Sequence, residues 1–257
     1  MTTGFLWEVP KEQPMTERTF QVHRYDPEVD EEPAFESYEV PVSESTSVLD
    51  GLFQIQEKQR ENLSMRFSCR QGVCGSCCME INGQARLACQ TPVSALKRNK
   101  VTVRPLYNLP VIKDLVVDME PFFESFSEID LSFDSDLDET DPPAVVQPDS
   151  RERKIITPRT DCVGCGACYS GCSVAGENYL GPAAINRALT LLKDSRESKT
   201  DERLDRLSES DGVWGCHVQG ECTDACPKDI PVSEGIQLLK REAVKQGIKQ
   251  RLPFLSD

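Results

Sequence analysis

Twelve cysteines lie in this 257-residue chain, and all but one belong to motifs with the spacing of iron–sulfur ligands. The first motif, SCRQGVCGSCCMEINGQARLACQ, has the plant-type spacing for a two-iron, two-sulfur cluster. Its predicted ligands are Cys69, Cys74, Cys77 and Cys89. Gly72 and Gly75 allow the backbone to approach closely, so that N–H groups can point at the cluster sulfurs.

A structural zinc site is the alternative for this motif, because cysteines separated by two residues also bind zinc. Zinc sites usually join two such pairs, whereas three cysteines with intervening glycines favour the iron–sulfur cluster. Cys78 is the cysteine left over. We interpret it as a small buried residue, and its exchange with Cys77 as a ligand stays open.

The C-terminal half contains two related cysteine motifs. DCVGCGACYSGCS has the complete spacing of a bacterial ferredoxin run, formed by Cys162, Cys165, Cys168 and Cys172. In CHVQGECTDACP the run is incomplete: it contains Cys216, Cys222 and Cys226, and Gln219 stands in the place of its second cysteine.

The fourth cysteine of each such run ligates the other cluster, which decides how these cysteines are shared. Cys226 is therefore predicted to complete a four-iron, four-sulfur cluster with Cys162, Cys165 and Cys168. Cys172, Cys216 and Cys222 remain for a third cluster that lacks a fourth thiolate. Because the neutral amide of Gln219 is a poor ligand for iron beside thiolates, a three-iron, four-sulfur cluster is predicted. A four-iron cluster with a solvent ligand is the alternative.

The composition excludes several classes of protein. A formal net charge of −14 argues against nucleic-acid binding, which relies on lysine and arginine. The N-terminal MTTGFLWEVPKEQP lacks a signal-peptide pattern, and the apolar stretches are far shorter than the roughly 20 residues that cross a bilayer. We therefore expect no signal peptide and no transmembrane segment, and metal-ligating rather than disulfide-bonded cysteines.

The elements around the first motif predict a small α+β domain. Strand-like alternation is found in residues 18–24 and 35–42, and a helix is expected within STSVLDGLFQIQEKQRE. Asn82-Gly83 marks a hairpin turn, and VTVRPL reads as a closing strand. A further helix is predicted over residues 111–126.

The remainder is predicted to be mostly α-helical. Helical spacing is found in the segment that begins GPAAINRALTLL and again in SEGIQLLKREAVKQGIKQ. Between the two parts lies a segment that is acidic, then proline-bearing, then basic, which is typical of a boundary. The expected domains are residues 16–120, with the two-iron cluster, and residues 161–250, with the other two. Residues 121–160 form a helix end and an acidic linker.

Three clusters of these types in this order resemble the iron–sulfur subunit of succinate dehydrogenase and fumarate reductase. The resemblance covers roughly residues 18–245 and extends to DLVVDM, YLGPAA, KDSR, DGVWGC and CPK. It implies an N-terminal β-grasp domain of the plant-type ferredoxin kind, followed by a bacterial-type ferredoxin domain. It also implies an oxidoreductase subunit that carries electrons from the FAD of a flavoprotein partner, through three clusters, to a membrane quinone.

The resemblance places the dicarboxylate site on the flavoprotein and the chain on the cytoplasmic face of the cell membrane, held by anchor subunits that can carry haem b. Ser173 follows Cys172 where the family commonly has proline. Ubiquinone-using members have a tryptophan near the position of Glu177, and its absence here favours menaquinone. His217 matches a histidine found near the quinone in some relatives, although a structural histidine is an equal alternative.

Succinate oxidation is the favoured direction, on the resemblance of His217 to that branch, and fumarate reduction is the alternative. A subunit of the heterodisulfide-reductase or glycolate-oxidase type is a remote alternative, because two complete cysteine runs would be expected there. A zinc-binding interaction module without redox activity is the alternative from another class.

Overall fold

The computed structural model describes residues 15–58, 62–138 and 140–251, and its N-terminal part is built on a β-hairpin. Strands β1 (Thr16–Arg24) and β2 (Ala34–Val42) pair antiparallel over their whole length. Their alternating pattern directs Phe20, Val22 and Val40 into the core. The two strands predicted from this pattern are thereby confirmed.

The hairpin belongs to a five-stranded sheet with the order β2-β1-β5-β3-β4. The added strands are β3 (Cys78–Ile81), β4 (Gln84–Leu87) and β5 (Lys100–Arg104). Strand β5 runs parallel to β1, and the other neighbours are antiparallel. Asn82 and Gly83 join β3 to β4 with φ angles of 51° and 82°, as expected for the two-residue turn that Asn-Gly predicts.

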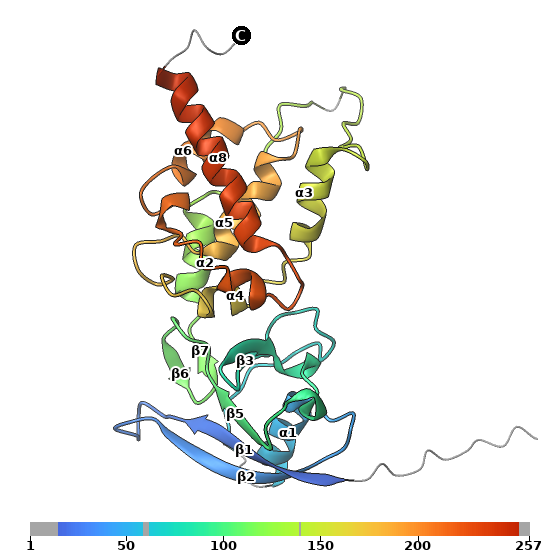
Figure 1. The fold of residues 1–257 in the computed structure, drawn as a ribbon, viewed down its shortest axis with the longest axis vertical. Helices are drawn as coiled ribbons and strands as arrows, with labels where there is room; N and C mark the ends of the chain where they lie inside the picture. The colour runs from blue at the N-terminus through green and yellow to red at the C-terminus, as the bar shows by residue number, and fades with distance from the viewer. Residues whose placement is uncertain (1–14, 59–61, 139, 252–257) are drawn as a thin grey trace, which may run out of the picture.

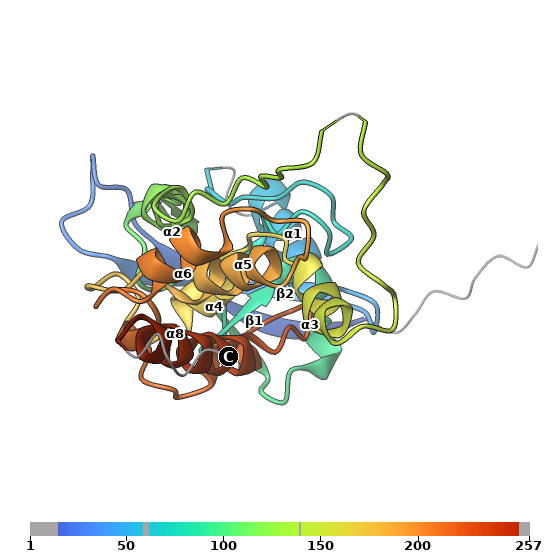
Figure 2. The ribbon, with the colours of Figure 1, turned by 90° about the horizontal axis from the view of Figure 1, so that it is seen from above.

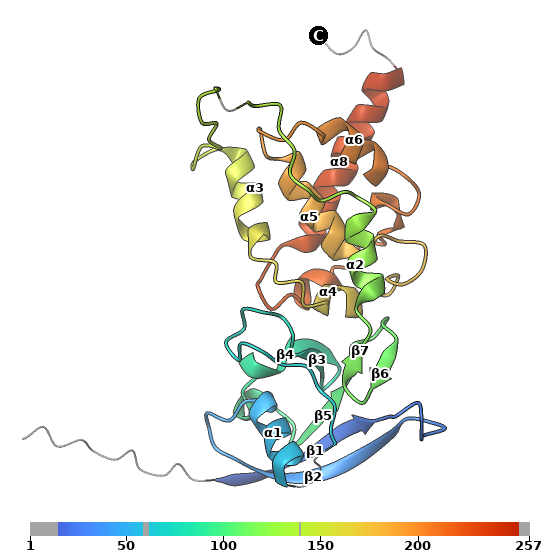
Figure 3. The same ribbon diagram turned by 180° about the vertical axis from the view of Figure 1, so that it is seen from behind.

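Helix α1 (Val48–Lys58) packs against this sheet (Figure 3). Ser47 and Asp50 cap its first turn reciprocally: the Asp50 N–H donates to the Ser47 hydroxyl and the Ser47 N–H donates to the Asp50 carboxylate. The expected apolar face is buried, and Gly51 lies directly over the ring of Phe20. The predicted helix in this segment is confirmed.

The helix predicted over residues 111–126 is wrong in its first half. That half forms a small hairpin of β6 (Val111–Lys113) and β7 (Val116–Val117), and helix α2 covers only Glu120–Ser127. Asp114 has a φ angle of 49° between the two strands, which ends any helix there. Its buried carboxylate accepts hydrogen bonds from Arg24 and from the backbone N–H groups of Tyr25 and Ser64. These distant partners outweigh the local helical pattern.

Replacing Asp114 by alanine is expected to destabilise the chain by about 3 kcal/mol, because the buried Arg24 guanidinium loses its nearer carboxylate, at 2.9 Å, and keeps only Glu36 at 3.9 Å. The side chains of Arg24 and Asp114 are only 8% and 2% exposed. The measurement is the urea midpoint followed by circular dichroism. The matched control is Lys113→Ala, which removes a more exposed ion pair with Asp26 and should shift the midpoint much less. Equal midpoints for the two variants would contradict this account.

The second part of the chain is helical, as predicted. Helix α5 lies at its centre, and α3, α6 and α8 surround it (Figure 2). The helices are α3 (Arg151–Thr160), α4 (Ala167–Ser170), α5 (Pro182–Leu192), α6 (Thr200–Leu207), α7 (Glu221–Asp224) and α8 (Val232–Arg251). Three short 3-10 turns complete the description: η1 (Ala88–Gln90), η2 (Val93–Ala95) and η3 (Val213–Gly215).

The segment after α2 lies against the helical part. Arg203 of α6 is buried in an ion pair with Glu197, and it also donates hydrogen bonds to the carbonyls of Ile129 and Ser132. A further hydrogen bond holds the same segment, because the Ser198 N–H donates to the carbonyl of Asp134. Residues 129–134 are therefore fastened to the helical part by buried polar contacts.

The sheet part and the helical part are stacked along the long axis of the molecule, with β3 and β4 facing α4 (Figures 1 and 3). Within the described residues, no helix combines the length and the apolar character that a membrane crossing requires.

Candidate iron–sulfur cluster sites

The loop that contains Cys69 and Cys74 is curled around sulfur. The backbone N–H groups of Gln71, Val73 and Cys74 point at the Cys69 Sγ, with N···S distances of 3.4, 3.3 and 3.3 Å. Gly72 and Gly75 have φ angles of 71° and 76°, which this curl requires. Such N–H groups stabilise negative charge on a ligand sulfur, as the sequence motif predicted.

The other two thiols of the first set come from the sheet side. Cys77 lies directly before β3 and faces Cys89, which lies in η1. Hydrogen bonding from Ser76 and from the Cys69 backbone lowers the pKa of Cys74 to about 6, whereas burial raises the pKa of Cys77. A buried thiolate requires a neutralising cation, so this group of four thiols fits an iron cluster.

The second set lies where the helical part meets the sheet part. Cys162, Cys165 and Cys168 follow one another around the start of α4, and Cys226 reaches them from beyond α7. Together the four thiols line a cavity that Phe122, Ile230 and Val232 close with apolar side chains.

Electrostatics at the second set are mixed. Burial raises the pKa of Cys162, Cys168 and Cys226, while backbone N–H groups act in the opposite direction at Cys162 and Cys226. Gly166 begins α4 with a φ angle of 79°, which turns the chain between the second and third thiol. Four half-buried thiols with inward N–H groups again fit a metal cluster.

The third set is formed by Cys172, Cys216 and Cys222. Cys172 lies just beyond α4, Cys216 follows η3, and Cys222 lies within α7. The N–H of Val218 donates to the Cys216 Sγ at 3.4 Å. The three thiols line a cavity, and His217, Gln219 and Tyr179 line it with them.

Gln219 and Ser173, the two departures from the expected pattern, contact each other. The Ser173 hydroxyl donates a hydrogen bond to the Gln219 side-chain oxygen at 2.8 Å. One of the two lone pairs of the Gln219 amide oxygen is therefore used, and the NH₂ group has no lone pair to offer a metal. Only three thiols line this cavity, together with an amide that is a poor iron ligand.

Cys78 lies between the first and second sets. It is 8% exposed, and its thiol faces both Cys165 and the neighbouring Cys77. Backbones approach closely at the same place: a Cβ on Gly75 would lie 2.8 Å from the Val163 carbonyl oxygen. Cys78 is buried, as predicted, but it packs at the junction of two cysteine sets rather than in an ordinary apolar core.

Cys78→Ala is expected to retain the iron of the first cluster, whereas Cys77→Ala is expected to lose it, because Cys77 and not Cys78 faces Cys89. The measurement is iron and acid-labile sulfide per chain, together with the EPR signal of the reduced two-iron cluster. A first cluster that survives Cys77→Ala would mean that Cys78 exchanges as a ligand.

Around the third set, the side chains reach the surface. His217, Val218 and Trp214 are exposed, and Lys240 lies over the Trp214 ring at 6.0 Å. The Lys240 ammonium also donates to the Cys216 carbonyl at 2.8 Å, so it braces the ligand loop from α8. His217 lines the third cavity from its exposed edge.

Several residues near these sets were not identified from the sequence. Tyr179 is buried against the third set, and burial raises its pKa well above the usual value. Glu80, Ser170 and Asn108 form polar contacts between the sheet part and the helical part. The only sequence signal for Tyr179 was its place in YLGPAA, and the other three carry no local signal.

Two family models match the chain, one on each part. The family described as "2Fe-2S iron-sulfur cluster binding domain" matches residues 19–124. The family described as "4Fe-4S dicluster domain" matches residues 159–230.

Over most of its length the chain is similar to iron–sulfur subunits of two enzymes, fumarate reductase and succinate dehydrogenase. The chain is 38% identical to a fumarate reductase iron-sulfur subunit of Mycobacterium tuberculosis, over 90% of this chain and 95% of that protein. It is 35% identical to a succinate dehydrogenase iron-sulfur subunit of Paracoccus denitrificans, over 95% and 94%. Among solved structures, a chain of the Mycobacterium smegmatis Sdh1 complex in the apo form has a TM-score of 0.81 and 27% identity, over 91% of this chain and 98% of that one.

Proposed function

The chain belongs to the family of iron–sulfur subunits of fumarate reductase and succinate dehydrogenase. We propose that its three cysteine sets hold three iron–sulfur clusters, and that electrons pass from one cluster to the next. The chain is an iron–sulfur electron-transfer subunit of an oxidoreductase complex, with a two-iron domain followed by a four-iron dicluster domain. The proposal concerns which residues hold each cluster, what the third cluster is, and which partners lie at the two ends.

The observation that carries the proposal is the contiguity of the three sets. Cys78 faces Cys77 of the first set and Cys165 of the second. Cys168 of the second set in turn lies close enough to Cys222 of the third set for the charge of Cys222 to raise the pKa of Cys168. Three clusters in these positions would therefore lie in sequence, with the second between the first and the third.

The ligand assignment follows from these groupings. The first cluster is assigned to Cys69, Cys74, Cys77 and Cys89, and the second to Cys162, Cys165, Cys168 and Cys226. Cys172, Cys216 and Cys222 are assigned to a three-iron cluster. When bound, the clusters supply one-electron redox chemistry. The chain contributes the thiolates, the N–H groups that stabilise their charge, and the apolar walls that set their burial.

Succinate oxidation in the tricarboxylic acid cycle and respiratory chain is the proposed direction, with electrons arriving from FAD on a flavoprotein partner. Fumarate reduction is the second candidate, and the names of the relatives with 36–38% identity favour it. The two directions use the same ligands in this chain, so the choice depends on the potentials of the clusters and the quinone.

The third set is proposed to lie toward the membrane. Its rim carries Trp214, Val218 and His217, all exposed, and an apolar rim with one imidazole suits contact with an anchor subunit and a quinone. We place the chain peripherally on the cytoplasmic face of the membrane, held by anchor subunits, with menaquinone as the favoured quinone. Haem b, where present, would belong to those subunits.

Low-temperature EPR on the purified complex during stepwise reduction tests the proposal. An oxidised three-iron signal should disappear on reduction, and two-iron and four-iron signals should replace it. Absence of the oxidised signal would contradict the assignment of Cys172, Cys216 and Cys222. A colourless preparation that contains zinc would overturn the iron–sulfur function as a whole.

A further inference from the structure

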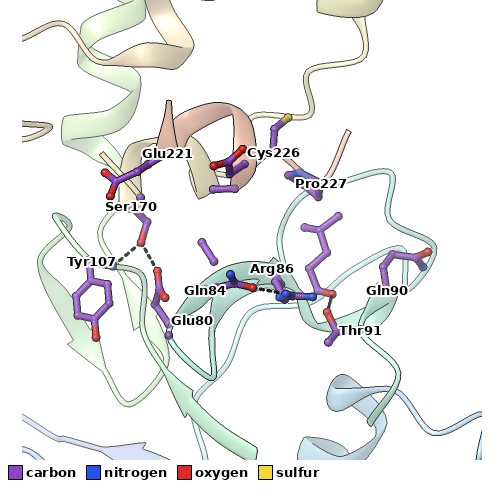
Figure 4. A pocket seen from close by; sticks show the side chains of 16 residues that line it. Glu80, Gln84, Arg86, Gln90, Thr91, Tyr107, Ser170, Glu221, Cys226 and Pro227 are labelled. Carbon is purple, nitrogen blue, oxygen red and sulfur yellow. Dashed lines mark hydrogen bonds between the residues drawn. The ribbon is translucent and has the colours of Figure 1, made fainter. Parts of the chain in front are cut away.

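The sheet part and the helical part meet along a groove of about 660 Å³ (Figure 4). Residues of the β3–β4 hairpin line one side, and residues of α4 and α7 line the other. A hydrogen bond crosses between them: the Ser170 hydroxyl donates to the Glu80 carboxylate at 2.7 Å. The same hydroxyl accepts from the backbone N–H of Tyr107 at 2.8 Å, so both of its roles are used.

This contact is buried on both sides. Glu80 is 3% exposed and Ser170 is 5% exposed. Burying a carboxyl group is costly unless hydrogen bonds satisfy it, and removing one partner of a buried hydrogen bond leaves the other partner unsatisfied. The Glu80–Ser170 bond therefore favours the docked arrangement of the two parts over one in which they separate.

Asn108 makes a second connection at the same place. Its side-chain amide lies 3.1, 3.3 and 2.8 Å from the carbonyl oxygens of Tyr169, Ser170 and Cys172. Two of these carbonyls belong to the last turn of α4, and the third lies just beyond it. The segment after β5 thus holds the end of α4 from the side of the sheet.

Glu80 and Ser170 both lie within a few residues of cysteines that are assigned to clusters. Glu80 lies in β3, three residues after Cys77, which is a ligand assigned to the first cluster. Ser170 lies in α4, two residues after Cys168 and two before Cys172, which are assigned to the second and third clusters. A single side-chain bond thus connects the strand that starts at the first site with the helical turn that lies between the other two.

We propose that Glu80, Ser170 and Asn108 are positioning residues that fix the spacing between the first and second clusters. This rests on the ligand assignment of the proposed function. Electron tunnelling slows steeply as a gap widens, so a contact that prevents the two parts from separating protects the transfer step. None of the three residues is assigned as a ligand to a cluster.

The test uses the assembled complex with its clusters reduced. Ser170→Ala and Glu80→Met are expected to weaken the spin–spin splitting between the two-iron and four-iron EPR signals, because the average spacing increases and varies more. Amide exchange in residues 78–81 and 167–172 should accelerate about tenfold, as expected when a buried polar group loses its hydrogen-bond partner.

Two controls separate positioning from general loss of stability. Ser125→Ala removes a buried hydroxyl that donates within α2, to the Phe122 carbonyl, and should leave the splitting unchanged. Glu80→Gln keeps an acceptor for Ser170 and should restore the parent splitting. Parent-like splitting and exchange in both Ser170→Ala and Glu80→Met would overturn the proposal.

The amide-exchange measurement does not depend on the identity of the clusters. If the iron content or the EPR signals contradict the proposed function, faster exchange in Ser170→Ala alone would still support the contact between the two parts. If the clusters are as proposed but exchange and splitting do not change, the positioning role fails while the function stands.

Discussion

Cys226→Ala is expected to abolish the four-iron EPR signal and to leave the oxidised three-iron signal in place. Cys226 is only four residues from Cys222, yet its thiol faces Cys162 and Cys165. Cys222 faces Cys172 and Cys216 instead. Without its fourth thiolate the second site cannot hold a complete four-iron cluster, so electron transfer from flavin to quinone should fall to background. The measurement combines EPR of the purified complex with its quinone-reductase activity.

Cys222→Ala provides the matched comparison. It removes a thiol from the same short motif, but it is expected to abolish the oxidised three-iron signal and to retain the four-iron signal. If the motif from Cys216 to Cys226 supplied all of its thiols to one cluster, both variants would lose the same signal. That result would contradict the shared use of the two motifs.

The grouping of these thiols could be predicted from the sequence because local spacing restricts it. In a run with gaps of two residues, one short loop presents three thiolates to one cluster and turns the fourth away. The glycine before each short helix supports the turn: Gly166 and Gly220 have φ angles of 79° and 88° before α4 and α7. The strands and helices with clear periodicity were predictable for the same reason, since each pattern is local.

The features that the sequence could not predict depend on partners far along the chain. The helix expected at residue 111 is replaced by a hairpin because Asp114 pairs with Arg24, 90 residues earlier. Ser170 and Glu80 are also 90 residues apart, and neither stands at a ligand position of the cysteine motif that contains it. Buried polar pairs of this kind have no periodicity, so their partners become known only when the chain is folded.

Gln219 is a case between these two. Its place in the motif predicted an open position at the third cluster, but the sequence did not indicate what its side chain does. The structure has its amide oxygen accept from Ser173, 46 residues earlier. One hydrogen bond therefore joins the serine that replaces the expected proline after Cys172 to the glutamine that replaces the second cysteine of the later motif.

Gln219→Cys is expected to convert the third site toward a four-iron cluster. The substitution places a thiolate in the wall of the third cavity, which Cys172, Cys216 and Cys222 already line. The oxidised three-iron EPR signal should be lost, and the reduction potential of the site should fall by about 60 mV or more, which is at least tenfold in a one-electron equilibrium. A redox titration followed by EPR measures both.

Ser173→Ala is the control for this conversion, because it breaks the hydrogen bond to Gln219 without adding a ligand. It is expected to retain the three-iron signal. If Ser173→Ala also produced a four-iron cluster, the restraint on the Gln219 amide, rather than the missing thiolate, would be what keeps the site at three irons. A thiolate is a far better iron ligand than an amide. An unchanged spectrum in Gln219→Cys would therefore mean that residue 219 lies too far away to supply the missing fourth ligand of the third cluster.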